Sequence, residues 1–420
     1  MGRISIEALK PGMVLAEDVS HATGRFLLGK GVELAENHLR MLKMWGVHSA
    51  SVEGVSGEAP VLSPEQIDPA ILKAAEQTTA ERFRHAGTEH PFLKKLFQIC
   101  ILRGAQQMAQ KQGTEPTPKA TNPEPAPESK TNRSPLANQA INIETLFDQD
   151  VCLASLPNIF WEITKVTSDP RSSAVHVADV ISKDTSLSAK LLKMVNSAFY
   201  GFPAKIDTIS RAVMIVGSKQ LSTLALGTSV IHIFRSIPSD LVDMRSFWEH
   251  SIACGIGARM FASYKNNSNA ERFFVAGLLH DIGRIVLYKR FPRLGKDLLL
   301  QSRENGDLLR TLERSSLGFD HSLIGGTLLK KWKLPLVLEH SVEYHHNPLR
   351  SQYPMEAAII CLGDIVANAL AIGSSGEAFV PPLLPSVWEE TGLPTEILTK
   401  IVQLIDHQVA DIMHTFFSEN

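Results

Sequence analysis

The 420-residue sequence is poor in cysteine. It has four, Cys100, Cys152, Cys254 and Cys361, which lie far apart and form no CxxC pair. This spacing excludes a zinc ribbon and a disulfide framework, and it fits a reducing compartment. We interpret all four as small, buried apolar side chains.

Long apolar segments are also lacking. Residues 1–7 contain no apolar region of the kind found in a secretory signal. No run approaches the roughly 18 uncharged apolar residues that a membrane span needs, and the best candidate, residues 357–372, contains Asp364. These absences predict a soluble, cytoplasmic protein without a membrane partner.

The chain carries little excess charge. Its 42 basic and 44 acidic residues leave a formal net charge of −2, with a pI near 6.7. No basic stripe with interleaved aromatic residues is present, so we expect no nucleic-acid partner.

The N-terminal part changes character along its length. Residues 1–55 combine short β-favouring runs with one helical pattern at Glu36–Trp45, which predicts a small β-rich domain. Residues 56–112 follow as a helical extension of unknown role. Residues 113–140 are rich in proline and polar residues and predict a flexible linker, with a proline-motif ligand as an alternative.

From Ile141 onward, apolar residues recur at helical spacing. The predicted helices span residues 174–196, 209–234, 247–264, 270–288, 321–332, 335–345 and 355–372. Since no alternating strand pattern competes, the second half should be all-helical. The predicted fold class is therefore mainly α, with a small α+β domain at the N-terminus.

Two acids stand in apolar surroundings. Asp281, next to His280, lies within the apolar stretch Phe273–Leu287, and Asp364 is the only charged residue of Ala357–Ala367. An ionised carboxylate in such a helix is costly unless it is paired or binds a cation. The two acids therefore predict a shared cation.

Histidines on neighbouring predicted helices supply further ligand candidates: His250, His321, His345 and His346. Taken singly, each has a simpler interpretation, as a half-buried core residue, a residue beside a helix cap, or an imidazolium near a helix C-terminus. Taken together with the acids, they favour a divalent metal site. Mixed imidazole and carboxylate ligands suit iron, manganese or zinc, in one or two ions.

The order of these residues resembles the HD superfamily of metal-dependent phosphohydrolases, and in particular its HDOD branch over residues 145–350. The resemblance is carried by Leu153–Pro157, Ile181–Leu187, Leu191–Gly201 with its Asn-Ser pair, Ala212–Gly217 and Trp332–Pro335. It implies an HDOD domain at residues 141–350 and a helical extension at 351–420 that completes its core. Residues 1–55, with Leu9–Met13, are similar to the small domain that precedes HD-GYP phosphodiesterases.

The sequence departs from the HD-GYP pattern. Arg284 replaces the lysine of that motif, Asn347-Pro348 replaces the glutamate and Gly-Tyr-Pro signature, and Ser246 offers no extra carboxylate. Hydrolysis of cyclic-di-GMP is therefore not expected, whereas metal binding is.

Two functions remain open. HDOD proteins are frequently non-catalytic regulators of bacterial signal transduction, which implies a signalling protein partner or a nucleotide ligand. The alternative is a metal-dependent phosphohydrolase or phosphodiesterase that acts on a nucleotide or cyclic nucleotide. In it, His250, His280, Asp281 and Asp364 would hold one ion, and His321, His345 and His346 a second. Arg284 would then bind phosphate, or it is simply a solvated arginine at a helix end.

Overall fold

The computed structural model describes residues 2–6, 9–20, 26–44, 47, 49–52, 67–112, 142–147, 158–169, 171–197, 199–202, 204–233, 241–265 and 269–417. The predicted linker at residues 113–140 lies outside the described residues, as does Leu153–Pro157. In the part of the chain that is described, no helix combines the length and apolar character that a bilayer crossing requires.

The N-terminal residues form a small unit of short strands and one helix. Strand β1 (Gly2–Ser5) pairs antiparallel with β4 (Ser49–Val52), β2 (Val19–Ser20) pairs with β3 (Phe26–Leu28), and α1 is Glu36–Met44. Leu15, Leu34, Leu42 and Val52 are buried at its centre and belong to a core separate from that of the helical body. The predicted β-rich character of this region is confirmed.

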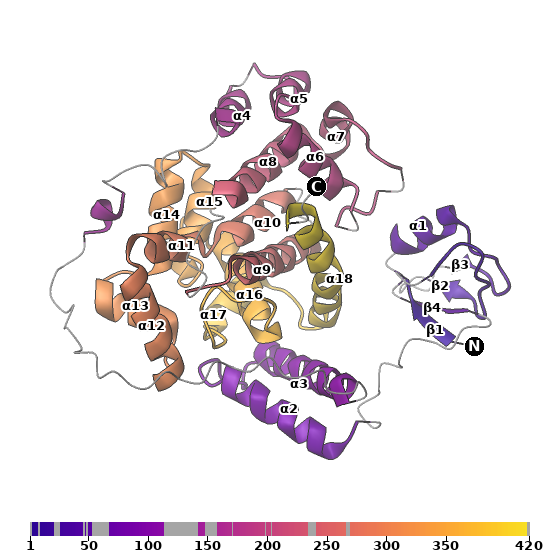
Figure 1. Ribbon diagram of the computed structural model, residues 1–420, viewed down its shortest axis with the longest axis horizontal. Helices are drawn as coiled ribbons and strands as arrows, with labels where there is room; N and C mark the ends of the chain where they lie inside the picture. Colours follow the sequence, from indigo (N-terminus) through magenta and orange to yellow (C-terminus); the bar gives the residue numbers. More distant parts are fainter. Residues whose placement is uncertain are drawn as a thin grey trace.

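The described residues after Val52 contain helices and no strands (Figure 1). The helices are α2 (Pro69–Arg82), α3 (Pro91–Gln112), η2 (Ile143–Leu146), α4 (Asn158–Ser168), α5 (Ala174–Ser182), α6 (Thr185–Val195), α7 (Ile209–Val216), α8 (Ser218–Ile233), α9 (Met244–Tyr264), α10 (Ala270–Leu279), α11 (Ile282–Arg290), α12 (Pro292–Asn305), α13 (Leu309–Leu317), α14 (His321–Lys331), α15 (Leu336–Glu343), η3 (Pro348–Arg350), α16 (Pro354–Leu370), α17 (Pro385–Thr391) and α18 (Ile397–Phe417).

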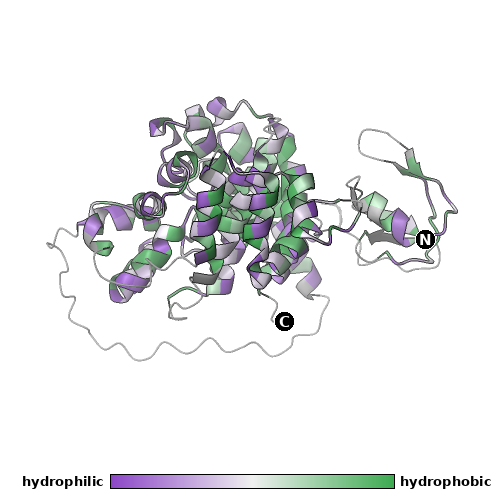
Figure 2. Cartoon of the chain, turned by 90° about the horizontal axis from the view of Figure 1, so that it is seen from above, coloured by the Kyte–Doolittle hydropathy of each residue, from purple (hydrophilic) through white to green (hydrophobic). Residues whose placement is uncertain are grey.

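Helix α9 lies at the centre of the helical body, where it packs against α10, α16 and α18 (Figure 1). Glycines allow these helices to approach closely. A Cβ on Gly277 of α10 would lie 2.6 Å from the Cα of Gly255 on α9, and one on Gly363 of α16 would lie 2.7 Å from the Cys254 carbonyl oxygen. The hydropathy colouring shows apolar residues concentrated in this central part (Figure 2). The close packing fixes the relative positions of the helices that carry the predicted ligands.

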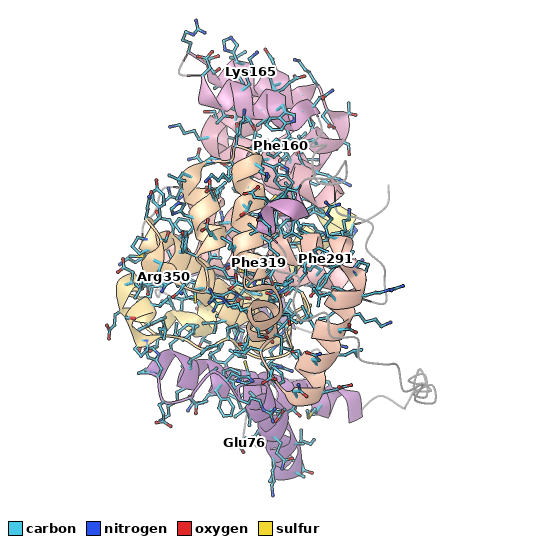
Figure 3. All side chains as sticks on the ribbon, turned by 90° about the vertical axis from the view of Figure 1, so that its left-hand side faces the viewer. Glu76, Phe160, Lys165, Phe291, Phe319 and Arg350 are labelled. Carbon is cyan, nitrogen blue, oxygen red and sulfur yellow. The ribbon has the colours of Figure 1, made fainter. Side chains whose placement is uncertain are left out.

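The helix pair α2–α3 lies at one end of the helical body and α4 at the other, as the labelled residues Glu76 on α2 and Lys165 on α4 show (Figure 3). Helix α3 of this pair contacts α16 and α18, and Arg82 at the end of α2 donates a hydrogen bond to the Ala369 carbonyl of α16.

Several predicted helices are interrupted in the structure. The predicted helix 174–196 breaks before α6, where the Asp184 side chain accepts a hydrogen bond from the Leu187 N–H and caps the new helix. The predicted helix 209–234 breaks at Gly217, whose φ of 100° is accessible to glycine but not to most residues. Periodicity alone did not show these breaks because the apolar spacing continues across them.

Candidate metal centre

The seven predicted ligands converge from five parts of the fold. His250 lies on α9, His280 and Asp281 lie between α10 and α11, and His321 is the first residue of α14. His345 and His346 follow α15, and Asp364 lies on α16. Their ligand atoms form two groups: His250, His280, Asp281 and Asp364; and His321, His345 and His346.

A helix break places the His280–Asp281 pair. The sequence predicted one continuous helix over residues 270–288, and this prediction is wrong at one point, because α10 ends at Leu279 and α11 begins at Ile282. At Asp281, the second of the two residues between these helices, φ is −98° and ψ is 10°. The Asp281 side chain makes no capping hydrogen bond to α11. The break therefore lets adjacent side chains, which would diverge by about 100° on a helix, face the same site.

The first group is compact. The His250 Nε2 and His280 Nε2 atoms each lie 3.3 Å from Asp364 Oδ1. His280 Nε2 lies 3.2 Å, and His250 Nε2 3.7 Å, from Asp281 Oδ2. Ligand atoms about 2.0–2.2 Å from one ion are themselves separated by roughly 3.0–3.5 Å. The spacing of this group fits a single divalent ion.

Asp281 also faces the second group. Its Oδ1 atom lies 3.0 Å from His321 Nε2, whereas its Oδ2 atom faces the first group. His321 Nε2 in turn lies 3.0 Å from His346 Nε2, and the rings of His345 and His346 are 4.0 Å apart. The two oxygens of one carboxylate thus join the two groups.

Unpartnered ring nitrogens test whether a metal fits this site. The Nδ1 atoms of His280 and His345 lie 2.7 Å from the carbonyl oxygens of Gly277 and Val342, so each Nδ1–H is the donor and, in the neutral ring, each Nε2 keeps a lone pair. Among the described residues, neither Nε2 has a hydrogen-bond partner, nor does either ring nitrogen of His250. A buried polar atom without a partner costs about 1–3 kcal/mol, and a cation bound by these lone pairs removes that cost.

The charges around the site also favour a bound cation. Four buried carboxylates contact the site histidines or Arg284, namely Asp281, Asp364, Glu313 and Glu377, and Arg284 is the buried arginine among them. Four negative charges against one positive leave −3 when all four are ionised and the imidazoles are neutral. Burial raises the pKa of Glu377, which can take up a proton. The remaining deficit still calls for one or two divalent cations, or for protonated imidazoles.

The imidazoles differ in their charge state. Burial lowers the pKa of His345 to about 3, with further lowering by His280 and His321. Burial and its neighbour His345 also lower the pKa of His346. Burial and Arg284 lower the pKa of His321 too, but the carboxylates of Glu313 and Asp281 outweigh them and raise it to about 9. Burial lowers the pKa of His280 as well, but the carboxylates of Asp281 and Asp364 outweigh it and hold this pKa well above its ordinary value. His345 and His346 are therefore neutral, the form that binds metal, whereas His280 and His321 are imidazoles whose proton a cation would displace.

The Arg284 guanidinium contacts one hydroxyl group and three carboxylates. Its guanidinium donates to the Ser375 hydroxyl at 2.7 Å and lies 3.5 Å from Asp281, 3.4 Å from Glu313 and 3.8 Å from Glu377. Its side chain is 2% exposed, so it is not the solvated arginine that the sequence allowed. These contacts favour a role in holding the carboxylates in place over the predicted binding of phosphate.

The sequence did not indicate which residues hydrogen-bond to the candidate ligands and orient them. Glu313 on α13 lies 2.5 Å from His321 Nδ1 and also accepts the His321 backbone N–H at 3.0 Å. Arg284 Nε lies 3.3 Å from the same Nδ1, but Nδ1 cannot both donate to the carboxylate and accept from the guanidinium. The shorter, charge-assisted contact decides that Nδ1 carries the proton and that Nε2 faces the site.

Asn368 is a second such residue, and the sequence contains a signal for it. Its amide donates to Asp364 Oδ1 at 2.7 Å. Because it lies four residues after Asp364 on α16, helical spacing alone places the two side chains on one face. For Glu313, which comes from a separate helix, no local pattern gives such a signal.

Replacing Glu313 with glutamine should weaken metal binding by about 10- to 100-fold, as loss of a carboxylate behind a ligating histidine typically does. The amide is neutral and no longer favours the Nδ1–H tautomer of His321. Competition with a chelator of known affinity measures the change, with Glu304→Gln on the exposed face of α12 as the control. Equal affinity in both variants would show that Glu313 does not orient His321.

Comparison with known proteins identifies the helical region. The HDOD domain family profile matches residues 153–348. An HDOD domain protein of unknown function from Geobacter sulfurreducens shares the fold with a TM-score of 0.53 and 22% identity, over 66% of this chain and 97% of that one. A candidate phosphohydrolase from Shewanella amazonensis gives a TM-score of 0.53 and 20% identity, over 65% and 97% of the two chains.

Two further relatives are matched over a smaller share of their own length. A candidate signal transduction protein from Marinobacter aquaeolei has a TM-score of 0.50 and 22% identity, over 65% of this chain and 60% of that one. An uncharacterized protein from Treponema pallidum is 26% identical over 196 residues, 46% of this chain and 38% of the relative. The chain thus matches well under half of that relative's length.

Residues 153–348 therefore match the HDOD domain family, as the sequence motifs predicted. Asp364 lies beyond the matched residues, yet its carboxylate lies 3.3 Å from His250 and His280. The similarity of residues 1–55 to the domain that precedes HD-GYP domains stays a prediction.

Proposed function

We propose that this HDOD-domain protein is a signal-transduction regulator whose His/Asp site holds one or two divalent ions of iron, manganese or zinc. In this proposal residues 1–55 and 56–112 are input segments, 113–140 is a linker, and 141–350 with 351–420 forms the metal-binding body. The signal transduction name of the Marinobacter aquaeolei relative is consistent with such a role. A signalling protein or a nucleotide would be the partner.

The regulatory proposal rests on helix α16, which connects the candidate metal site with the N-terminal helix pair. It bears Asp364 in its interior and meets the N-terminal helix pair at its C-terminal end. There, the Ala369 carbonyl accepts hydrogen bonds from Arg82 of α2 at 3.1 Å and from Cys100 of α3 at 3.2 Å. A shift of Asp364 on metal binding or release would therefore reach residues 67–112 along one helix.

Hydrogen–deuterium exchange tests this coupling. Full-length protein loaded with manganese is compared with chelator-treated protein, and α2–α3 should exchange faster once the metal is removed. Helix α5, which carries none of the seven predicted ligands and packs against α4 at the other end of the body, serves as the internal control (Figure 1). Faster exchange confined to α9, α10 and α16 would contradict the coupling.

A metal-dependent phosphohydrolase is the second candidate. It is favoured by the arrangement in which Asp281 faces both groups and by His346, the one predicted ligand that is not fully buried. When bound, divalent ions supply a Lewis acid for a phosphoryl oxygen and lower the pKa of a coordinated water. The chain's own residues would keep His345 and His346 neutral, hold Asp281 between the groups and admit the substrate beside His346.

Turnover of phosphodiester and cyclic nucleotide substrates with added manganese tests this candidate. We expect any genuine activity to be lost in Asp364→Asn and retained in Asp179→Asn, an exposed acid on α5. Cyclic-di-GMP is included as the substrate that the Asn347-Pro348 sequence disfavours. No turnover by metal-loaded protein across the panel would leave regulation as the function.

A further inference from the structure

A second polar site lies away from the metal centre, where α2 and α3 meet the C-terminal end of α16. A cavity of about 220 Å³ opens there. Its lining includes Arg82, Arg103, Cys100 and Gln107 from the helix pair, and Ala369 and Ala371 from the end of α16. The lining contains two arginines and no acidic residue.

Arg82 has no carboxylate partner. Among the described residues it forms no ion pair, and its side chain makes one hydrogen bond, the donation from Nη1 to the Ala369 carbonyl. Burial lowers the pKa of Arg82. A guanidinium has five N–H donors, so capping the end of α16 uses only part of its capacity.

Arg103 is only partly satisfied. Its Nη1 pairs with Asp406 on α18. Its Nε is buried and has no hydrogen-bond partner among the described residues. A buried N–H without an acceptor is costly, so an acceptor supplied from the cavity would stabilise this arrangement.

The other lining groups add no negative charge. Burial raises the pKa of Cys100 to about 12, so its thiol stays neutral, and it donates to the Ala369 carbonyl. The hydroxyls of Thr78 and Thr79 donate to the Ala74 and Ala75 carbonyls within their own helix. The cavity is smaller than the roughly 300–1,000 Å³ of sites for drug-sized ligands, which excludes a dinucleotide and fits a small anion.

We propose that this cavity binds a small oxyanion, a phosphate or carboxylate group, between the guanidinium groups of Arg82 and Arg103. Planar guanidinium groups match the oxygens of both anions through paired hydrogen bonds. The bound group would contact the helix pair and residues 369–371 at once. It would therefore brace residues 67–112 against the helix that carries Asp364, whether or not the metal site is occupied.

Calorimetric titration of the full-length protein with inorganic phosphate, and separately with acetate, tests the proposal. Both are run at constant ionic strength. We expect saturable binding of at least one anion, weakened about 10- to 100-fold in Arg82→Gln and in Arg103→Gln, because each variant loses charged hydrogen bonds. Arg171→Gln, whose side chain is 90% exposed and remote from the cavity lining, should bind like the wild type.

Phosphate could also bind at the metal centre, so the location is measured as well. Hydrogen–deuterium exchange should show protection of residues 75–82, 100–108 and 369–371 on anion binding, lost in the two variants. Metal content and melting temperature report whether each variant is folded. The proposal is overturned if folded Arg82→Gln and Arg103→Gln bind as the wild type does, if protection appears only around the metal centre, or if neither anion binds.

Discussion

Protein with Asp281 replaced by asparagine is expected to purify with less than about a tenth of the metal that the wild type carries, because the one carboxylate that faces both ligand groups is lost. In the wild type its Oδ2 lies 3.2 Å from His280 Nε2 and its Oδ1 lies 3.0 Å from His321 Nε2. An amide offers one oxygen and no charge. It cannot serve both groups.

Elemental analysis of protein purified without chelator measures this loss. Asp179→Asn removes an equivalent charge from the exposed face of α5 and should keep the full metal content. Circular dichroism establishes that both variants are folded. A folded Asp281→Asn protein with wild-type metal content would show that Asp281 is not a ligand.

The largest stability effect is expected for Gly283→Ala. Helices α11 and α14 cross at this residue, and a Cβ on Gly283 would lie 2.0 Å from the His321 carbonyl oxygen and 2.8 Å from the Gly325 nitrogen. Both atoms are backbone, so the helices must move apart. We expect a loss of about 3 kcal/mol in the free energy of unfolding, which for a domain of this size lowers the melting temperature by roughly 6–12 °C.

A matched substitution separates this clash from a general effect of alanine. A Cβ on Gly104 of α3 would meet only the Ala75 Cβ at 3.6 Å, an ordinary contact. Gly104→Ala should therefore leave the melting temperature unchanged or raise it slightly, since alanine favours a helix interior. Because His321 must shift in Gly283→Ala, metal affinity should fall together with stability. Equal melting temperatures for the two variants would contradict the close approach of α11 and α14.

The helical fold was predictable because apolar residues recur at the helical period through most of the second half. The breaks were not, because they depend on single residues. Gly217 and the capping carboxylate of Asp184 interrupt apolar patterns that continue on both sides. The break at His280–Asp281 likewise interrupts a continuous apolar pattern, and it places both side chains at the candidate metal site.

The candidate ligands could be singled out from the sequence for a physical reason. Asp281 and Asp364 are acids in apolar helices, and that imbalance is visible without a structure. The residues that contact these candidate ligands gave no comparable signal in the sequence. Glu313 and Glu377 reach the site from separate elements, and only the fold shows that Arg284 is surrounded by carboxylates.

Anomalous X-ray scattering from crystals of metal-loaded protein tests the central claim most directly. The unpartnered Nε2 atoms of His250 and His280 predict an anomalous peak about 2.0–2.3 Å from both and from carboxylate oxygens of Asp281 and Asp364. A second peak beside His321, His345 and His346 would mark the second ion. Absence of any peak, with imidazolium–carboxylate hydrogen bonds filling the site, would contradict it.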